Sequence, residues 1–263
     1  MPTGIARDYV IGGMKLQALL YVAHGSRVRE GNREAVQFIE SVKPFFDVDI
    51  QEHCFLELAE PSILKGVEKC VSKGATRIAV IPILLLSANH MKIDIPSEIE
   101  KAKTYFPFVD FTIGKPLGVH EKLIYSLHSR VMAQCPSPPG ETDILLIGRG
   151  SSDPDVQKDL DQIAKLLQQT YHYAKVDTCF LYGNGPLFEE KLPTLCESQN
   201  RVFIIPYLLF TGLLKLSIQK KVAKQGFSSR RVVLCDCLGY DENVRQVFIQ
   251  RIEETLYSFA GSG

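Results

Sequence analysis

The chain has 263 residues, of which 45% are hydrophobic, and its 30 basic and 30 acidic residues cancel. This length allows two modest domains or one large one, with a sizeable core. The balanced charge argues against nucleic-acid binding and a polybasic membrane surface, and no apolar run approaches the roughly 20 residues that span a bilayer. Seven scattered cysteines without a CxxC pair predict reduced thiols in a cytoplasmic protein, with neither a zinc nor an iron–sulfur site.

Residues 1–13 lack the apolar core of a signal peptide, and an apolar strand pattern follows Met14 directly. We therefore expect the native start at Met14 and a leader or added extension before it. After this, apolar patterns alternate in period between strands and helices. The predicted strands are 16–23, 48–58, 77–86 and 109–113, and the predicted helices are 32–42, 59–74, 96–105 and 119–132. The order βαβαβαβα predicts a parallel, doubly wound α/β sheet.

The strand expected at 77–86 is almost continuously apolar, which is typical of a central strand covered on both faces. It runs into small and polar residues and then His90. Asp94 and Pro96 follow, and this pair predicts a helix start with Asp94 as the capping side chain. His90 is thus expected just beyond the carboxyl end of a central strand, the edge at which open α/β sheets place ligands.

The pattern repeats after a proline-rich segment, CPSPPGET, at 135–142. Three segments of the first half match three of the second at an offset of about 125 residues: LLYVAHGS with ILLIGRGS, CFLELAEP with CFLYGNGP, and RIAVIPILLLS with RVFIIPYLLFT. Three matches in register indicate an internal duplication. We predict an amino-terminal α/β lobe at 14–134, a linker at 135–142 and a carboxyl-terminal α/β lobe at 143–263, with a cleft between the lobes.

The two halves differ in polar residues at the predicted strand ends. His24 corresponds to Arg149, Glu57 to Tyr182 and His90 to Leu214. Carboxyl ends of parallel strands share one sheet edge, so the first lobe is expected to bring two imidazoles and a carboxylate together. Such a set suits a divalent metal ion or an acid–base pair. The alternatives are a hydrogen-bonded surface histidine and a glutamate that caps or pairs.

Four other histidines are weaker candidates. His53 shares strand parity with Glu57, but a role at the same edge is not favoured. His120, His128 and His172 fall in predicted helices, where a solvated or structural role is expected.

The motifs HGSR at 24–27, FLELAEPS at 55–62 and PILLLSANHMKIDIP at 82–96 resemble those of the class II tetrapyrrole chelatases, and most of all the sirohydrochlorin ferrochelatases. Related cobaltochelatases share them. The resemblance extends to about residue 260 and includes GRGSSDPD at 148–155 and PYLLFTG at 206–212. It implies a bilobal α/β fold that holds a tetrapyrrole between the lobes and inserts Fe2+ without an organic cofactor.

The resemblance also implies roles for individual residues. The catalytic and metal-binding residues fall on His24, His90 and Glu57, with one histidine accepting a pyrrole proton. Arg27 and Arg149 are candidates to pair with substrate carboxylates. The residues expected against the ring are Leu85, Leu86, Ser87, Ala88 and Asn89, of which Asn89 departs from the small residue usual in the family.

The expected partners are sirohydrochlorin and a divalent metal ion, bound by a monomer without nucleic acid or membrane. Co2+ or Ni2+ would bind the same ligands at least as tightly as Fe2+, so a cobaltochelatase is an alternative. A non-catalytic carrier of a tetrapyrrole or metal is another. Phosphoryl transfer through a histidine, suggested by HGSR, is disfavoured because only Arg27 and Arg29 lie near in sequence and no glycine-rich phosphate loop is evident.

Overall fold

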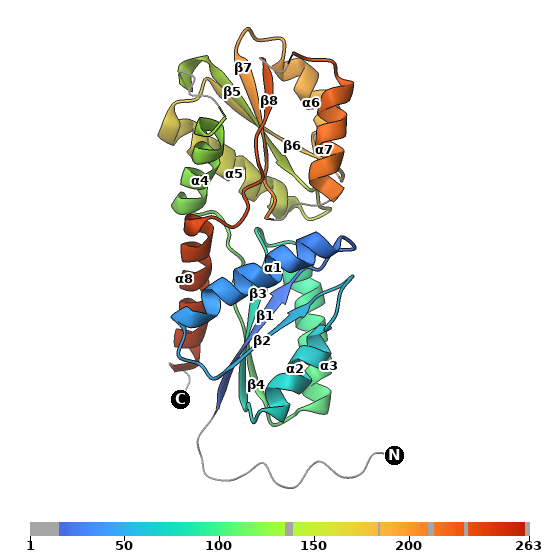
Figure 1. Cartoon of the computed structure of the whole chain (residues 1–263), viewed down its shortest axis with the longest axis vertical. Helices are drawn as coiled ribbons and strands as arrows, with labels where there is room; N and C mark the ends of the chain where they lie inside the picture. The colour runs from blue at the N-terminus through green and yellow to red at the C-terminus, as the bar shows by residue number, and fades with distance from the viewer. Residues whose placement is uncertain (1–15, 135–138, 184, 210–212, 229–230, 261–263) are drawn as a thin grey trace.

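The computed structural model describes residues 16–134, 139–183, 185–209, 213–228 and 231–260 (Figure 1). Two four-stranded parallel sheets have the orders β2-β1-β3-β4 and β6-β5-β7-β8. The strands are β1 (Gln17–Ala23), β2 (Ile50–Phe55), β3 (Arg77–Ile83), β4 (Asp110–Ile113), β5 (Thr142–Gly148), β6 (Lys175–Phe180), β7 (Arg201–Pro206) and β8 (Val232–Leu234). The shared order confirms the predicted fold of two similar α/β lobes.

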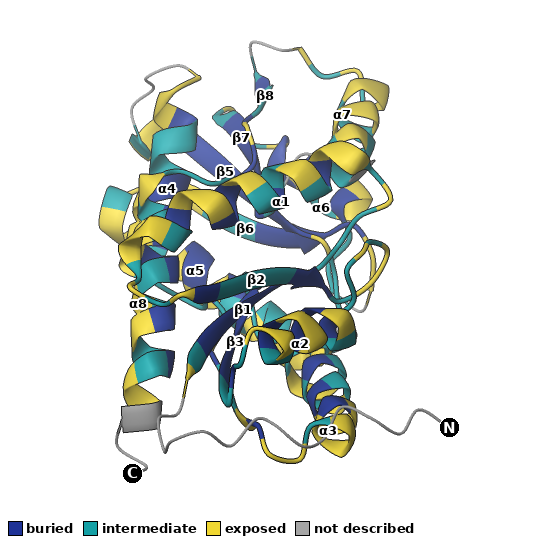
Figure 2. Ribbon diagram, turned by 60° about the horizontal axis from the view of Figure 1, so that its bottom comes forward, coloured by how far each residue is buried: buried dark blue, intermediate teal, exposed yellow. Residues whose placement is uncertain are grey.

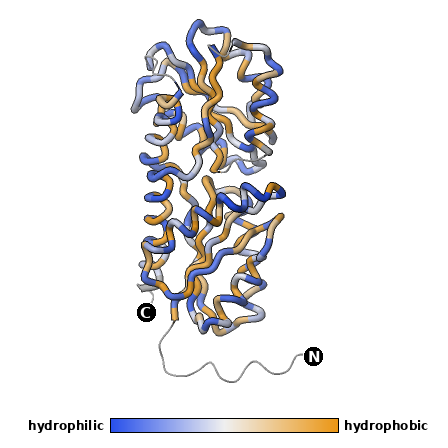
Figure 3. The backbone as a smooth tube through the Cα atoms, viewed as in Figure 1, coloured by the Kyte–Doolittle hydropathy of each residue, from blue (hydrophilic) through white to orange (hydrophobic). Residues whose placement is uncertain are grey.

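Helices cover both faces of each sheet. They are α1 (Arg29–Val42), α2 (Ile63–Ser72), α3 (Ile95–Tyr105), α4 (Glu121–Met132), α5 (Pro154–Tyr171), α6 (Phe188–Leu195), α7 (Leu213–Lys224) and α8 (Glu242–Ala260), with short turns η1 (Lys43–Phe45), η2 (His90–Asp94) and η3 (Pro139–Glu141). Figure 2 shows the strands buried and the helices exposed on their outer faces, and Figure 3 shows that the strands form the most hydrophobic tracts. Double coverage explains why β1 and β3 are almost continuously apolar and why every residue of β5 is buried. No helix within the described residues is long and apolar enough to cross a membrane.

The last helix of each half packs against the other half. Helix α4 contacts α5 and β7, whereas α8 contacts β3, β4 and α1 (Figure 1). Apolar residues from both halves consequently form one continuous cluster, in which Phe38 of α1 stacks on Tyr240 with ring centroids 4.4 Å apart. The linker at 135–142 between the two repeat units stays a prediction. The sequence did not predict that α4 and α8 are exchanged, each packing against the half to which it does not belong in sequence. The expected leader at 1–13 lies outside the described residues.

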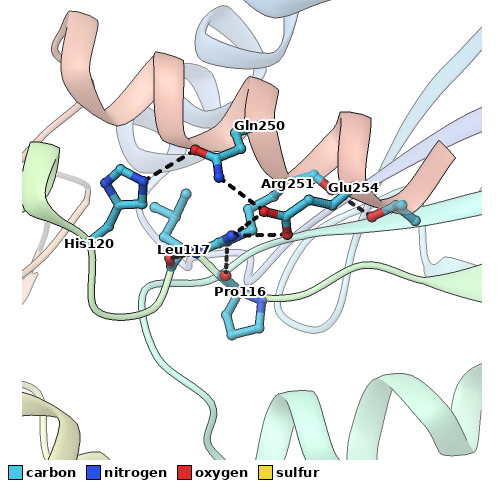
Figure 4. A network of polar contacts seen from close by, with 7 residues as sticks. Pro116, Leu117, His120, Gln250, Arg251 and Glu254 are labelled. Carbon is cyan, nitrogen blue, oxygen red and sulfur yellow. Dashed lines mark hydrogen bonds and ion pairs between the residues drawn. The ribbon is translucent and has the colours of Figure 1, made fainter. Parts of the chain in front are cut away.

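Polar contacts fix α8 on the first half (Figure 4). Arg251 donates to the backbone oxygens of Pro116 and Leu117, each at 3.0 Å, and pairs with Glu254 at 2.7 Å. In return, Arg130 of α4 donates to the backbone oxygen of Leu238 at 2.7 Å. Each exchanged helix therefore binds backbone groups of the half that it covers.

Two predicted boundaries at the end of β3 are wrong. The strand ends at Ile83 rather than near Leu86, because the oxygens of Leu84 and Leu85 accept hydrogen bonds from the amides of residues 117 and 118 instead of a neighbouring strand. Helical structure begins with η2 at His90, before α3. Asp94 is therefore already helical, and it does not cap α3 through its side chain.

Candidate functional site

Strand ends place the first two groups of the site. His24 directly follows β1, and Glu57 lies two residues beyond β2. Backbone pairing continues past the strands, because the amide of Glu57 donates to the oxygen of His24 at 3.1 Å. Gly25 has φ +90°, and a Cβ atom there would lie only 1.8 Å from the Glu57 oxygen. A glycine at this position is thus what permits the two strand ends to approach so closely.

The structure brings His24, Glu57 and His90 together. One ligand atom from each lies within 4.8 Å of the others. The Nε2 atoms of His24 and His90 are 3.1 Å apart, and His24 Nε2 is 3.4 Å from Glu57 Oε1. For ligands about 2.1 Å from a metal ion, these separations correspond to ligand–metal–ligand angles of roughly 95° and 110°. The three groups can therefore hold one divalent ion.

Hydrogen bonds on the far side of each imidazole set its tautomer. His24 Nδ1 lies 2.9 Å from the carbonyl oxygen of Gly25, and His90 Nδ1 lies 2.7 Å from Asp94 Oδ2. A carbonyl or carboxylate oxygen can only accept, so the Nδ1 atoms of the neutral rings carry the hydrogens. The Nε2 lone pairs then face the shared space. This is the tautomer required for binding a metal ion or accepting a proton.

The surroundings of His24 favour its neutral form. Burial is the main cause that lowers the pKa of His24, and the positive charge of Arg149 and the His90 ring lower it further. The backbone oxygen of Gly25 and the carboxylate of Glu57 act in the opposite direction. His24 thus retains its lone pair at a lower pH than an exposed histidine would.

The second half contributes the cation next to His24. Arg149 follows β5, as His24 follows β1, and its Nη1 lies 2.8 Å from His24 Nε2. Further along this loop, Ser152 accepts a hydrogen bond from Asn89 at 3.3 Å. Lys92 of η2 pairs with Asp153 at 2.8 Å and with Asp155 at 2.6 Å. Residues 149–155 therefore contact the segment that carries His90.

The other expected substrate contacts are placed differently. Arg27 is exposed, and none of the ion pairs among the described residues involves it. Leu85 and Leu86 pack partly against the core cluster. Ser87 and Ala88 are partly buried in the segment that leads to His90.

The remaining histidines lie apart from the metal-ligand group found in the described residues. His53 lies within β2, where its ring contacts Phe55. His120 caps α4 by accepting the amide of Lys122, and His128 of α4 hydrogen-bonds the hydroxyl of Tyr173 at 2.7 Å. His172 ends α5 in a left-handed conformation. These positions agree with the structural roles expected for the three histidines outside β2.

Sequence reasoning missed the contacts of Asp94, for which the sequence pattern predicts a helix cap. Its spacing of four residues from His90 was visible, and residues four apart share one helical face. The pairing of Lys92 with Asp153 and Asp155 was also missed, although both aspartates belong to the GRGSSDPD motif. Contacts between halves far apart in sequence leave no periodic signal.

A comparison with family models matches residues 18–134 and 143–255 to CbiX, so both halves carry the same family pattern. The chain belongs to the CbiX family. Among characterised relatives of this CbiX protein, the sirohydrochlorin ferrochelatases of Priestia megaterium and Bacillus subtilis are each 42% identical. The match to the Priestia megaterium protein covers 92% of each chain. The match to the Bacillus subtilis protein covers 93% of this chain and 94% of the relative. A sirohydrochlorin cobaltochelatase of Priestia megaterium is 36% identical over 94% of this chain and 82% of its own length.

Solved structures agree with this placement in the CbiX family. SirB from Bacillus subtilis with Fe3+ has a TM-score of 0.85 and 41% identity, covering 94% of this chain and 98% of SirB. SirB from Bacillus subtilis subspecies spizizenii in complex with cobalt has a TM-score of 0.81 and 39% identity over the same shares. The fold, with its two lobes, is that of these chelatase structures.

Proposed function

We propose that this CbiX protein is a sirohydrochlorin ferrochelatase, which inserts Fe2+ into sirohydrochlorin and releases two protons to give siroheme. The observation that carries the proposal is the meeting of two imidazole Nε2 atoms and one carboxylate oxygen within 4.8 Å. The 42% identity to ferrochelatases over nearly the whole chain supports the same activity.

In the proposed reaction His24, His90 and Glu57 bind the metal ion, which is a substrate. Two pyrrole N–H protons must leave before four ring nitrogens can hold the ion. A neutral imidazole is well suited to accept such a proton near pH 7, and the lowered pKa of His24 keeps this ring neutral. Glu57 is exposed and lies 3.4 Å from His24, so it is placed to pass a proton to solvent or to complete the metal site.

Asp94 is proposed as the group that orients His90. Its hydrogen bond at 2.7 Å fixes the ring plane and keeps the hydrogen on Nδ1, as carboxylates behind metal-binding histidines commonly do. Asp94 is therefore a positioning residue rather than a metal ligand in this proposal.

The tetrapyrrole is proposed to bind between the lobes. Leu85, Leu86, Ser87, Ala88 and Asn89 would lie against the ring, because they lead directly to His90. Sirohydrochlorin carries carboxylates around its rim, and guanidinium groups bind carboxylates with paired hydrogen bonds. Arg27 and Arg149 are the proposed partners of these carboxylates.

Cobaltochelatase activity is the second candidate, supported by the 36% identity to a cobaltochelatase. Intrinsic affinity does not separate the two metals, because Co2+ binds nitrogen and oxygen ligands at least as tightly as Fe2+. The higher identity to ferrochelatases favours iron. The rates of Fe2+ and Co2+ insertion, compared at the metal concentrations found in cells, would distinguish the two activities.

The test replaces His24 and His90 singly by alanine and measures metal insertion from the absorbance change of sirohydrochlorin. Each variant is expected to lose at least about 100-fold in turnover, because both a ligand and a proton acceptor are removed. His53→Ala is the matched control, since it removes an imidazole from the same sheet outside the site. Full turnover in both site variants would exclude the assignment. Stoichiometric binding without turnover under excess metal would instead identify a carrier.

A further inference from the structure

Arg149 hydrogen-bonds the atom of His24, Nε2, that would bind a metal ion. The Nδ1 hydrogen of His24 is committed to Gly25, which leaves Nε2 with a single lone pair. Arg149 Nη1 donates to this lone pair at 2.8 Å. The same lone pair cannot accept this hydrogen bond and bind an ion at one time. A divalent cation beside an undisplaced guanidinium would also face strong repulsion.

Contacts across the lobes hold Arg149 in this place. The loop that carries it is joined to η2 by the pairing of Lys92 with Asp153 and Asp155, and by the hydrogen bond from Asn89 to Ser152. Arg149 itself is exposed, and none of the ion pairs among the described residues involves it. Its charge is therefore available to a carboxylate whenever it leaves His24.

We propose that Arg149 competes with the incoming metal ion for His24 and moves to a carboxylate of the tetrapyrrole when the ion binds. This inference rests on the proposed chelatase function and adds a coupling to it. Metal binding frees the guanidinium for the substrate, and a substrate carboxylate draws the guanidinium away from the metal position. By linkage, each ligand then raises the affinity for the other by the same factor.

The strength of the competing hydrogen bond sets the expected effect. Hydrogen bonds that involve a charged group change an equilibrium by about tenfold or more. Removing the guanidinium should therefore raise metal affinity about tenfold when no tetrapyrrole is present. It should lower the apparent affinity for the polycarboxylate substrate by a similar factor. Opposite changes in the two affinities are not expected from a merely structural residue.

The experiment compares the wild-type protein, Arg149→Gln and Lys92→Gln. Isothermal titration with Co2+ alone gives the metal affinity, and initial rates at varied sirohydrochlorin and varied metal give the two KM values. Arg149→Gln is expected to bind Co2+ about tenfold more tightly and to show a higher KM for sirohydrochlorin and a lower KM for metal. Lys92→Gln loosens the same loop without removing the competitor, so its metal affinity should change less than about threefold.

Two results would overturn the competition while leaving the chelatase function intact. One is an unchanged or weaker Co2+ affinity in Arg149→Gln in a preparation whose wild type inserts metal normally. The other is an equal gain in Lys92→Gln, which would attribute the effect to loosening of the lobes. Unimpaired Co2+ binding by His24→Ala, or no insertion by the wild type, would overturn the proposed function and this inference with it.

Discussion

Replacing Gly25 by alanine should separate the metal ligands without touching any of them. The new Cβ would lie 1.8 Å from the backbone oxygen of Glu57, whereas real contacts do not fall below 3.0 Å. The backbones of His24 and Glu57 must therefore move apart by about 1.2 Å. Metal–ligand distances tolerate about 0.2 Å, so this displacement is several times what the site can absorb. We expect Co2+ affinity, measured by isothermal titration, to fall at least about tenfold.

The duplication supplies a matched control for this substitution. Gly150 has φ +110°, and its added Cβ would also lie 1.8 Å from a backbone oxygen, that of Tyr182. Both substitutions force alanine into a left-handed conformation and a clash, so each should lower the free energy of unfolding by about 2–4 kcal/mol. Only Gly25→Ala moves the metal ligands. Gly150→Ala displaces the neighbouring Arg149 instead, so its affinity for Co2+ should not fall and, by the competition proposed for Arg149, should rise.

Urea unfolding followed by circular dichroism shows whether the two variants are equally destabilised and remain folded. If Gly25→Ala then binds Co2+ as tightly as Gly150→Ala, the close approach of the strand ends is not what places the ligands. The reasoning from backbone geometry to metal affinity would be refuted, even though both glycines would remain important for stability.

Two further predictions concern the imidazoles. Asp94→Ala should weaken Co2+ binding about 10- to 100-fold, because it releases the His90 ring. Asp94→Asn still offers an accepting oxygen to His90 and should lose less Co2+ affinity. Equal losses in the two variants would show that the charge of Asp94 matters and not its hydrogen bond. Burial lowers the pKa values of His24, His53 and His128, so as pH falls below about 6.5 the unfolded chain takes up protons first. The free energy of unfolding, measured in urea titrations, should therefore decrease from pH 7.5 to pH 5.5. The double variant His53→Gln/His128→Gln should show a weaker dependence of this free energy on pH. An unchanged dependence would contradict the attribution of the pH effect to these buried histidines.

The sheets were predictable because their strands carry a local signal. A strand covered on both faces must be apolar throughout, and 18–23 and 78–83 are buried without exception. The offset between the halves then predicted which residues share one sheet edge, and His24, Glu57 and His90 indeed lie together. Periodicity and repetition were sufficient for this part.

The end of β3 and the start of α3 were not predictable from the same signals. Leu84 and Leu85 are as apolar as the strand before them, yet their backbone oxygens pair with a distant loop at 117–118. Asp94 followed by a proline two residues later resembles a helix start, yet the helix had already begun at His90. In both places a tertiary contact decides the outcome. The exchange of α4 and α8 has the same origin, since an amphipathic helix does not specify which sheet it covers.

The exchange of helices bears on how a tetrapyrrole can enter. Separating the halves along α4 and α8 would expose the continuous apolar cluster and break the contacts of Arg251 and Arg130, which would cost a large part of the folding free energy. The contacts around the metal ligands are mostly of another kind, because Lys92, Asp155 and Asn89 are exposed polar groups and only the Asp153 carboxylate, 7% exposed, is largely buried. Exposed ion pairs contribute only about 0–1 kcal/mol each. Separating residues 89–92 from residues 149–155 would therefore cost less free energy than separating the halves along α4 and α8. The same separation would carry Arg149 away from His24.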